Sequence, residues 1–227
     1  SKTGLPGIVK KCNKCGLIFK SFEKAIEVIY DDEYATSFLE NDEYYGIEAI
    51  NFFHKIIKET FSRLKKNEPK LLDVGSGVGI MLQAAKKVGF DPTGVELSEK
   101  LAKKIQEKGY KIINKDVTDI PPGESYDAIT MMDLIEHLED PSSVLLTLKG
   151  LIGSEGELIV YTPNHNSLIV KIAHIFYKLG IKSPMENIFA CTHTCFFTTK
   201  TLSDIIQKTG YEITDIKHFH YDTNRPG

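Results

Sequence analysis

The feature that most constrains the fold is a repeating pattern that begins after Pro69, in which short apolar segments alternate with amphipathic segments of helical period. The apolar segments cover residues 71–74, 93–97, 111–116, 126–132 and 157–161, and a helix at 200–210 precedes an alternating segment at 211–219. Strands that are separated by helices form a parallel sheet through right-handed crossovers. The sequence therefore predicts an α/β fold with a doubly wound, mostly parallel sheet.

Local signals mark where several of these helices begin and end. Ser98 is expected to be the N-cap of one helix, and Gly109 stands where a left-handed residue would end it. Asp140 and Pro141 predict the N-cap and first turn of the helix after the fourth strand.

The segments outside this repeat predict how the chain is organised. Residues 1–42 are expected to form an irregular N-terminal extension, and residues 43–227 one catalytic-sized domain. Apolar residues at steps of three and four predict a helix at 43–66 that packs on the core. Residues 165–199 interrupt the repeat and predict a helical lid insertion, in which 167–181 carries a wide apolar face. Three alternatives are open for what covers that face: the rest of the same domain, a second copy in a homodimer, or an apolar substrate. Contact with a membrane is the least favoured.

The charge balance and the apolar runs argue against several functions. Lys and Arg total 28 against 31 Asp and Glu, a net charge of −3, so the chain lacks the basic excess typical of nucleic-acid binding. No apolar run approaches the roughly 18 residues of a membrane span, and the first residues carry no apolar signal segment. Four cysteines, unevenly spaced, are compatible with a reducing compartment. We therefore expect no nucleic-acid partner, no membrane span and a cytoplasmic location.

A glycine-rich turn and two acids predict the kind of ligand. Residues 73–79, Asp-Val-Gly-Ser-Gly-Val-Gly, lie between a strand and a helix, where doubly wound folds bind nucleotide-like ligands. The third glycine comes too early for a dinucleotide-binding turn, and the Asp73 carboxylate would repel a pyrophosphate but attract an ammonium group. Glu96 ends the second strand and can accept hydrogen bonds from ribose hydroxyls, while Asp116, with Val117 beside it, can accept one from an adenine amino group. The set predicts an amino-acid-bearing nucleoside, although each acid alone could be a helix cap.

These motifs resemble those of class I S-adenosylmethionine (SAM)-dependent methyltransferases over about residues 45–219. Residues 133–141, Asp-Leu-Ile-Glu-His-Leu-Glu-Asp-Pro, look like the segment after strand four in the subgroup that includes quinone-biosynthesis O-methyltransferases. The resemblance implies a Rossmann-like sheet of seven strands with a terminal antiparallel hairpin, of which 211–219 is the first arm. It implies SAM as methyl donor and S-adenosylhomocysteine as product. The residues that it implies for cofactor binding are Asp73, Gly75, Ser76, Gly77, Gly79, Glu96, Leu97, Asp116, Val117, Met132 and Asp133.

The reaction is an in-line displacement at the methyl carbon of a sulfonium, which is already activated. For an oxygen nucleophile, the protein must also remove a proton. His137, after the fourth strand, and His193, after the lid, are therefore the candidate catalytic residues, with a structural histidine as the alternative for each. Glu136 and Asp133 are expected to bind substrate or orient His137, or to support the cofactor pocket.

The N-terminal part of the chain carries two further motifs. Tyr44 and Tyr45 start a helix that the resemblance places over the active site, so one hydroxyl is expected to reach the cofactor carboxylate, with packing as the alternative. Cys12-x-x-Cys15 has the shape of half a zinc knuckle. Cys191, His193 and Cys195 could complete such a site, but nothing in the sequence brings these segments together. No metal site is predicted.

The leading interpretation is a SAM-dependent methyltransferase that acts on a small-molecule acceptor, as an O-methyltransferase. Methylation of amino groups in macromolecules usually goes with an Asn/Asp-Pro-Pro-Tyr/Phe loop, which residues 133–136 do not resemble. A hydroxyl group on a quinone precursor, a sugar or another metabolite is the expected acceptor. The alternatives are an NAD-dependent oxidoreductase on a similar sheet and a non-catalytic binding module that retains the fold.

Overall fold

The computed structural model describes residues 8–21, 42–121, 123–181 and 193–219, with side chains from residue 49 onward in the first long helix. The elements are β1 (Ile8–Lys11), β2 (Ile18–Ser21), α2 (Asp42–Leu64), β3 (Lys70–Val74), α3 (Ile80–Val88), β4 (Asp91–Val95), α4 (Glu99–Glu107), β5 (Lys111–Ile113), η1 (Val117–Asp119), β6 (Tyr126–Met132), η2 (Ile135–His137), α5 (Pro141–Leu151), β7 (Ile152–Tyr161), α6 (Leu168–Lys178), β8 (Cys195–Phe196) and α8 (Thr199–Lys208).

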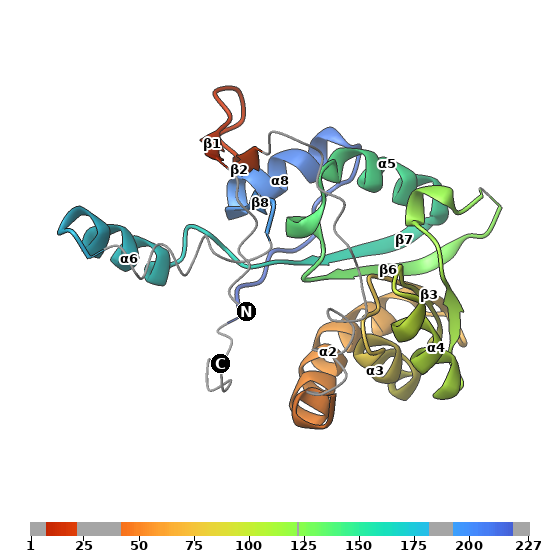
Figure 1. The fold of residues 1–227 in the computed structure, drawn as a ribbon. Helices are drawn as coiled ribbons and strands as arrows, with labels where there is room; N and C mark the ends of the chain where they lie inside the picture. The colour runs from red at the N-terminus through yellow and green to blue at the C-terminus, as the bar shows by residue number, and fades with distance from the viewer. Residues whose placement is uncertain (1–7, 22–41, 122, 182–192, 220–227) are drawn as a thin grey trace.

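A five-stranded sheet in the order β5-β4-β3-β6-β7 forms the centre of the molecule (Figure 1). Every neighbouring pair in it is parallel, so all five strands end at the same edge. β3 lies in the middle, and the chain proceeds outward from it in both directions, through β4 and β5 on one side and β6 and β7 on the other. The doubly wound α/β prediction is confirmed.

Helices cover both faces of this sheet and bury it. In Figure 1, α2, α3 and α4 lie on one face, and α5 and α8 lie on the other. Ile57 of α2 packs with Leu71 of β3 and Phe90 in one buried cluster. On the opposite face, Leu145 and Leu148 of α5 pack against the other side of β3 and β6. Burial on both faces explains why these strands are apolar runs rather than alternating segments.

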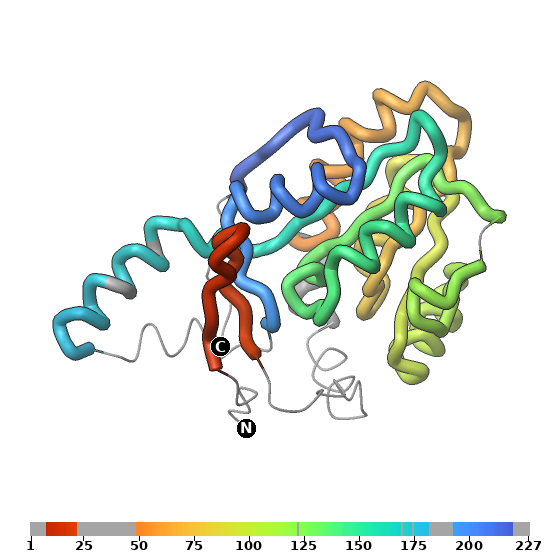
Figure 2. The backbone as a smooth tube through the Cα atoms, turned by 90° about the horizontal axis from the view of Figure 1, so that it is seen from above, coloured from red at the N-terminus to blue at the C-terminus, as the bar shows by residue number. Residues whose placement is uncertain are grey.

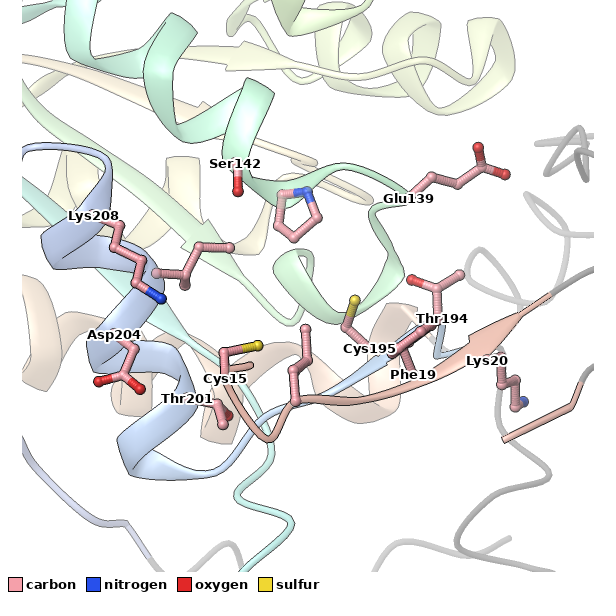
Figure 3. A pocket seen from close by; sticks show the side chains of 13 residues that line it. Cys15, Phe19, Lys20, Glu139, Ser142, Thr194, Cys195, Thr201, Asp204 and Lys208 are labelled. Carbon is pink, nitrogen blue, oxygen red and sulfur yellow. The ribbon is translucent and has the colours of Figure 1, made fainter. Parts of the chain in front are cut away.

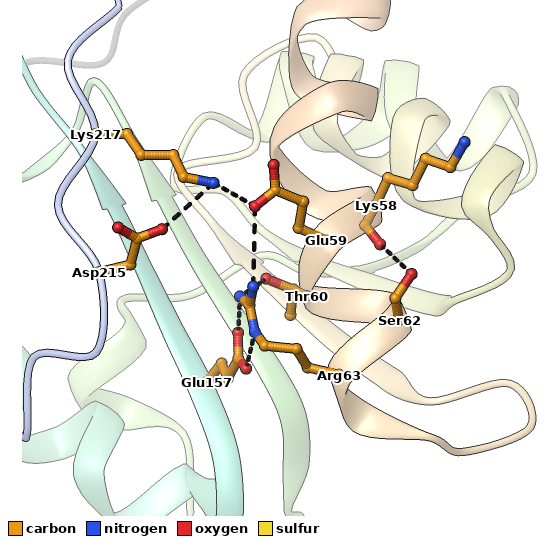
Figure 4. Close-up of polar contacts among 8 residues, drawn as sticks. All are labelled: Lys58, Glu59, Thr60, Ser62, Arg63, Glu157, Asp215 and Lys217. Carbon is orange, nitrogen blue, oxygen red and sulfur yellow. Dashed lines mark hydrogen bonds and ion pairs between the residues drawn. The ribbon is translucent and has the colours of Figure 1, made fainter.

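Polar contacts fix α2 against the edge strand of the sheet (Figure 4). Arg63 donates two hydrogen bonds to Glu157 of β7, from Nε at 2.6 Å and from Nη2 at 2.5 Å. Lys217, in the segment after α8, forms ion pairs with Glu59 of α2 and with Asp215. These contacts place α2 over the edge formed by β7.

The predicted helix boundaries agree with the structure. The Ser98 side chain accepts a hydrogen bond from the backbone N–H of Leu101 at the start of α4, and Gly109 follows that helix with φ 84°. Asp140 caps α5 through the N–H groups of Ser142 and Ser143, and Pro141 occupies the first turn.

Two expectations about the ends of the chain differ from the structure. Residues 211–219 are not a strand, and the sheet in the described part of the chain has five strands rather than seven. Alternating apolar residues make a strand only where a neighbouring backbone supplies hydrogen bonds, and no described strand pairs with this segment. Residues 8–21, expected to be irregular, form the β1–β2 hairpin, and β2 pairs with β8 in a small antiparallel sheet (Figure 2).

Helix α6 projects away from the sheet in both views (Figures 1 and 2). Apolar side chains are exposed along it and just beyond it, with Leu168 71% and Leu179 72% exposed. The lid and the homodimer contact both stay predictions. No helix in the described ranges is both long enough and apolar enough to cross a membrane.

Candidate active site

The carboxyl ends of the parallel strands place most of the predicted site residues along one edge of the sheet. The glycine-rich turn follows β3, Glu96 follows β4, Asp116 lies shortly after β5, and Asp133 follows β6. Open α/β sheets bind their ligands at this edge. The structure therefore brings the sequence-predicted cofactor residues to the place where such folds carry a ligand.

The glycine-rich turn depends on backbone conformations that favour glycine. Gly75, Gly77 and Gly79 have φ values of 76°, 54° and 83°, a region that costs other residues about 1–2 kcal/mol. A Cβ atom added to Gly77 would meet no atom within 4 Å, so the turn faces open space there. The Ser76 hydroxyl donates to the backbone oxygen of Asp73 at 2.9 Å, which closes the turn on itself.

Asp73 lies deeper in the sheet than the sequence suggests. Its side chain is 1% exposed, and Oδ1 accepts a hydrogen bond of 2.7 Å from the Thr130 hydroxyl on the neighbouring strand β6. Burial, more than the nearby charge of Glu96, raises the pKa of Asp73 to about 7. Its charge therefore changes near neutral pH.

Glu96 holds the glycine-rich turn as well as facing the ligand edge. Oε2 accepts the backbone N–H of Gly77 and Oε1 accepts that of Ser98, each at 2.9 Å. Burial raises the pKa of Glu96, while these two hydrogen bonds lower it, so the balance is upward. A carboxylate accepts about four hydrogen bonds, so acceptor capacity remains for a ligand.

Asn114 is a residue of this edge that the sequence analysis missed. Its side-chain amide donates to the backbone oxygens of Glu96 at 2.7 Å and Leu97 at 3.0 Å, and so holds the segment after β4. Leu97 itself is 44% exposed. Asn114 directly follows β5, and its position at a strand end is the signal that could have identified it.

Asp116 and Val117 form the start of the short helix η1. Asp116 is exposed, and its Oδ1 accepts hydrogen bonds from the backbone N–H and the hydroxyl of Thr118 at 2.8 and 2.6 Å. Asp116 thus caps η1, which is the structural role given above as the alternative to ligand binding. Only its Oδ1 atom accepts these two hydrogen bonds. Val117 is buried in the core beneath it.

Met132 and Asp133 occupy the end of β6. Met132 packs with the α2–α3 side of the core. Asp133 has a φ of 50° and donates its backbone N–H to the carbonyl oxygen of Tyr161 at 2.9 Å, at the end of β7. This left-handed conformation turns the chain from the strand into η2.

Two catalytic candidates that are 56 residues apart meet at this edge. The rings of His137 and His193 have centroids 4.8 Å apart and lie nearly perpendicular, at 85°. Glu136 joins them, because its Oε1 lies 3.9 Å from Nε2 of His193. One ligand atom from each of these three residues lies within 4.8 Å of the others, and in the described part of the chain this is the group whose geometry could hold a metal ion.

Burial controls the charge of this cluster. The Glu136 side chain is 1% exposed, and burial, followed by the charge of Asp133, raises its pKa to about 7. Burial also lowers the pKa of His193 to about 4, with a smaller contribution from His137. His193 is therefore a neutral imidazole at pH 7.

The backbone around Thr194 fixes the position of His193. The Thr194 N–H and hydroxyl both donate to the backbone oxygen of Glu136, at 2.8 and 2.9 Å. The carbonyl oxygen of Thr194 in turn accepts the N–H of Lys20 in β2 at 2.8 Å. The N-terminal hairpin thus supports the segment that carries His193.

Thr162 and His165 are further polar residues of this region that the sequence analysis did not identify. The Thr162 hydroxyl donates to Oε2 of Glu136 at 2.8 Å. The His165 ring lies 6.3 Å from that of His193, and burial lowers its pKa to about 4. Thr162 directly follows β7, so its position at the end of a strand, the signal that identified Glu96, could have identified it.

The cysteine motif does not join the histidine cluster. Cys12 and Cys15 lie in the turn of the β1–β2 hairpin, where the N–H of Gly16 donates to the oxygen of Cys12 at 2.9 Å. Hydrogen bonds from the backbone of Cys15 and Lys14 lower the pKa of Cys12. Cys191 and the side chains of Tyr44 and Tyr45 lie outside the described residues, so their predicted roles stay predictions.

A separate pocket of about 450 Å³ lies between the hairpin, the start of α5 and α8 (Figure 3). Cys15 and Cys195 both line it, with Lys208 and Asp204 of α8 on its other side. It contains none of the glycine-rich turn. It is therefore distinct from the edge that carries the predicted cofactor residues.

The sheet order, the glycine-rich turn and the acids at the strand ends define a doubly wound α/β protein, a class that binds nucleotide-like ligands at this edge of the sheet. Residues 45–216 match the family described as a methyltransferase domain. The chain is 31% identical over 160 residues to a ubiquinone biosynthesis O-methyltransferase from Coxiella burnetii (strain RSA 331 / Henzerling II), covering 66% of this chain and 67% of that protein. A second relative of that name, from Thiobacillus denitrificans (strain ATCC 25259 / T1), is 36% identical over 107 residues, which are 43% of this chain and 46% of the relative.

Solved structures show the same fold. The plantazolicin methyltransferase BpumL, in complex with SAH, matches 80% of this chain and 71% of its own with a TM-score of 0.60 at 18% identity. A SAM-dependent methyltransferase from Thermotoga maritima matches 79% of this chain and 80% of its own, with a TM-score of 0.55 at 20% identity. The chain belongs to the class I SAM-dependent methyltransferases, and SAM is its cofactor.

Proposed function

We propose that this methyltransferase transfers the methyl group of SAM to a hydroxyl group of a small molecule. The observation that carries the proposal is the cluster of Glu136, His137 and His193 at the ligand edge of the sheet. An oxygen nucleophile must lose a proton during methyl transfer, so its enzyme needs polar groups beside the acceptor. The relatives named ubiquinone biosynthesis O-methyltransferase support an oxygen acceptor.

The cofactor lies along the strand ends in this proposal. The turn formed by Gly75, Ser76, Gly77 and Gly79 receives the methionine portion, and ionised Asp73 attracts its ammonium group from beneath the turn. The remaining acceptor positions of Glu96 bind the ribose hydroxyls. Leu97, Asp116 and Val117 surround the adenine, with Oδ2 of Asp116 accepting from its amino group, and Met132 and Asp133 lie beside the methionine end.

The net charge of −3 favours a small acceptor over a nucleic acid, because phosphate backbones are bound by basic surfaces. The cluster lies just after β6, so a hydroxyl beside it would also lie beside the proposed methionine end of SAM. Such a position aligns the acceptor oxygen with the methyl carbon, which supplies much of the rate increase in a displacement of this kind.

Two measurements test the proposal. Calorimetric titration with SAM, SAH and NAD should show binding of the first two only, whereas binding of NAD alone would favour an oxidoreductase. Labelled SAM should then methylate hydroxylated aromatic or sugar acceptors in preference to matched amines. Methylation confined to amines, or cofactor binding without transfer to any acceptor class, would contradict an O-methyltransferase.

A further inference from the structure

The pocket between the β1–β2 hairpin, α5 and α8 is large enough for a small organic molecule (Figure 3). Its volume of about 450 Å³ falls within the range of about 300–1,000 Å³ that is typical of ligand sites. None of its lining residues belongs to the glycine-rich turn or to the cluster of Glu136, His137 and His193. A molecule in this pocket would therefore occupy a different site from those proposed for SAM and for the methyl acceptor.

Apolar side chains from the hairpin, α5, β8 and α8 form much of the wall of this pocket. They are Leu17, Phe19, Pro141, Cys195 and Ile205. Two threonine hydroxyl groups also line the pocket, but both already donate to backbone oxygens, that of Thr194 to Glu136 and that of Thr201 to Thr198. These parts of the wall therefore offer apolar contact rather than hydrogen bonds to a ligand.

Lys208 supplies a positive charge at the pocket. It lies in the last turn of α8, and its side chain extends from the helix toward the cavity (Figure 3). Among the described residues, its ammonium group has no hydrogen-bond or ion-pair partner. Asp204, one turn earlier, is paired with Lys200 at 2.7 Å, and the exposed Glu139 points away from the cavity. Neither acid of the lining therefore neutralises Lys208.

Ser142 adds a hydrogen-bonding group on the opposite wall. Its backbone N–H donates to the capping residue Asp140 at 3.1 Å, but its hydroxyl group makes no hydrogen bond within the part of the chain that the structure describes. The hydroxyl lies at the first turn of α5, across the cavity from α8 (Figure 3). A hydroxyl and an ammonium group both donate hydrogen bonds to a carboxylate. Together with the apolar wall, they match an anionic group on an apolar body.

We propose that this pocket is a second small-molecule site, which binds an apolar monocarboxylate such as an aromatic acid. The apolar body packs on the wall formed by Phe19, Pro141 and Ile205, and the carboxylate lies between Ser142 and Lys208. A single negative charge fits best, because the other lysine of the lining, Lys20, already has its ammonium group 5.8 Å from the centre of the Phe196 ring. The site is independent of the proposed O-methyltransferase function.

The pocket is linked to the cluster at the ligand edge through the segment that begins β8. Thr194 lines the pocket, and its hydroxyl donates to the backbone oxygens of Glu136 at 2.9 Å and Leu138 at 2.8 Å. The Cys195 thiol, also in the lining, donates to the same Leu138 oxygen at 3.8 Å. A ligand that binds only the folded arrangement disfavours its local opening. Occupation of the pocket therefore stabilises the segment that carries His193.

The binding test uses naphthoate, whose fluorescence can be followed because the chain contains no Trp. Neutral naphthamide and cationic naphthylmethylamine carry the same ring system and serve as charge controls. We expect one naphthoate per chain, with naphthamide bound about three- to fivefold more weakly, as for one partly exposed ion pair, and the amine most weakly of all. In Lys208→Gln the acid and the amide should bind equally well, because the charge that distinguishes them is gone.

Ser142→Leu and Ser143→Leu form a matched pair within one turn of α5. Ser142 lines the pocket and Ser143 is exposed outside it, while both keep the backbone N–H groups that Asp140 caps. Leucine at position 142 occupies ligand space and should weaken naphthoate binding by about 10-fold or more, the scale of a one-methylene misfit in an apolar pocket. Ser143→Leu should leave the affinity unchanged. Thermal unfolding and SAH titration show that each variant is folded and retains its cofactor edge.

Cys15 reports where the ligand lies, because it lines the pocket and Cys12 of the same turn does not. Trypsin cleaves at Lys14 between them, so mass spectrometry follows each thiol separately. At ten times its dissociation constant, naphthoate should slow alkylation of Cys15 by iodoacetamide by up to about 10-fold and leave Cys12 unaffected. Hydrogen exchange should also slow at the backbone N–H groups of Lys20 and Thr194, which bond across the pocket wall.

Several results would overturn the proposal. Absence of saturable naphthoate binding up to about 1 mM, equal affinity of the parent chain for acid and amide, or tighter binding of the amine would exclude a carboxylate site. Equal effects of the two leucine variants, protection of Cys12 instead of Cys15, or displacement of naphthoate by SAH would place the ligand elsewhere. None of these measurements depends on methyl transfer, so failure of the O-methyltransferase proposal is a separate outcome.

Discussion

The Glu96→Gln substitution separates the contribution of the Glu96 side chain to folding from its contribution to cofactor binding. Glu96 accepts backbone N–H groups from Gly77 and Ser98 at 2.9 Å each, and in the proposed function it also binds the ribose hydroxyls. Glutamine has nearly the same shape but only one acceptor oxygen, and it carries no charge. Its amide group therefore meets one of the two N–H donors with another donor.

The expected effect on folding is small because two changes oppose each other. Losing one charge-assisted hydrogen bond costs about 2 kcal/mol. Burial raises the pKa of Glu96, which means that the folded protein disfavours its charged form, and a neutral side chain recovers a comparable amount. The free energy of unfolding should change by less than about 1 kcal/mol.

The expected loss of cofactor affinity is large because no favourable change offsets the lost hydrogen bond. Replacing a charged acceptor of the ribose hydroxyls removes at least one hydrogen bond worth about 2–3 kcal/mol, which is roughly a 30- to 150-fold loss of affinity. SAH titration calorimetry measures the affinity, and urea unfolding measures the stability.

The matched control for this variant is Glu107→Gln, an exposed acid at the end of α4, which should leave both quantities unchanged. SAH affinity of Glu96→Gln within threefold of the parent would refute the assignment of Glu96 to the ribose.

Three further predictions follow from single contacts. The pKa of Asp73 is about 7 in the folded protein against 3.8 when unfolded, so Asp73 contributes stability below pH 4 that is lost as pH rises towards 7, about 4 kcal/mol in total. The Asp73→Asn variant should lack this part of the pH dependence of the unfolding free energy measured in urea. An unchanged pH profile would contradict the raised pKa. Gly94→Ala places its Cβ atom 2.5 Å from the Ser76 hydroxyl oxygen and 2.7 Å from a methyl carbon of Ile112, so it should lower the free energy of unfolding by about 1–3 kcal/mol. The control Gly150→Ala, which has open space in α5, should raise it by up to about 1 kcal/mol. Equal effects of the two variants in urea unfolding would contradict the predicted clash. Arg63→Ala breaks the paired bonds to Glu157 and should cost about 1 kcal/mol, measured by thermal unfolding at low and high salt; no loss at low salt would mean that this contact does not secure α2.

The sequence predicted the central sheet well because its signals are local. A strand, a glycine-rich turn and a helix follow one another within residues 70–88, and each is specified by its own residues. Parallel strands end at one edge, so Glu96 and Asp133 could be assigned to the same edge before any contact was known. The prediction of a strand at 211–219 was wrong because alternating apolar residues form a strand only beside a partner strand, which the segment's own residues do not supply.

Tertiary structure alone decided which polar side chains meet beyond the end of β6. His137 and His193 were separate candidates in the sequence, and neither gives a sign that their rings lie 4.8 Å apart. Their meeting depends on Thr194 binding the backbone of Glu136 and on the hairpin that supports it. Hydrogen bonds between segments that are far apart in the chain leave no local pattern of residues. For that reason the succession of strands and helices along the chain and the glycine-rich turn can be deduced from sequence, whereas the buried carboxyl group and its two neighbouring imidazoles come together only in the folded protein.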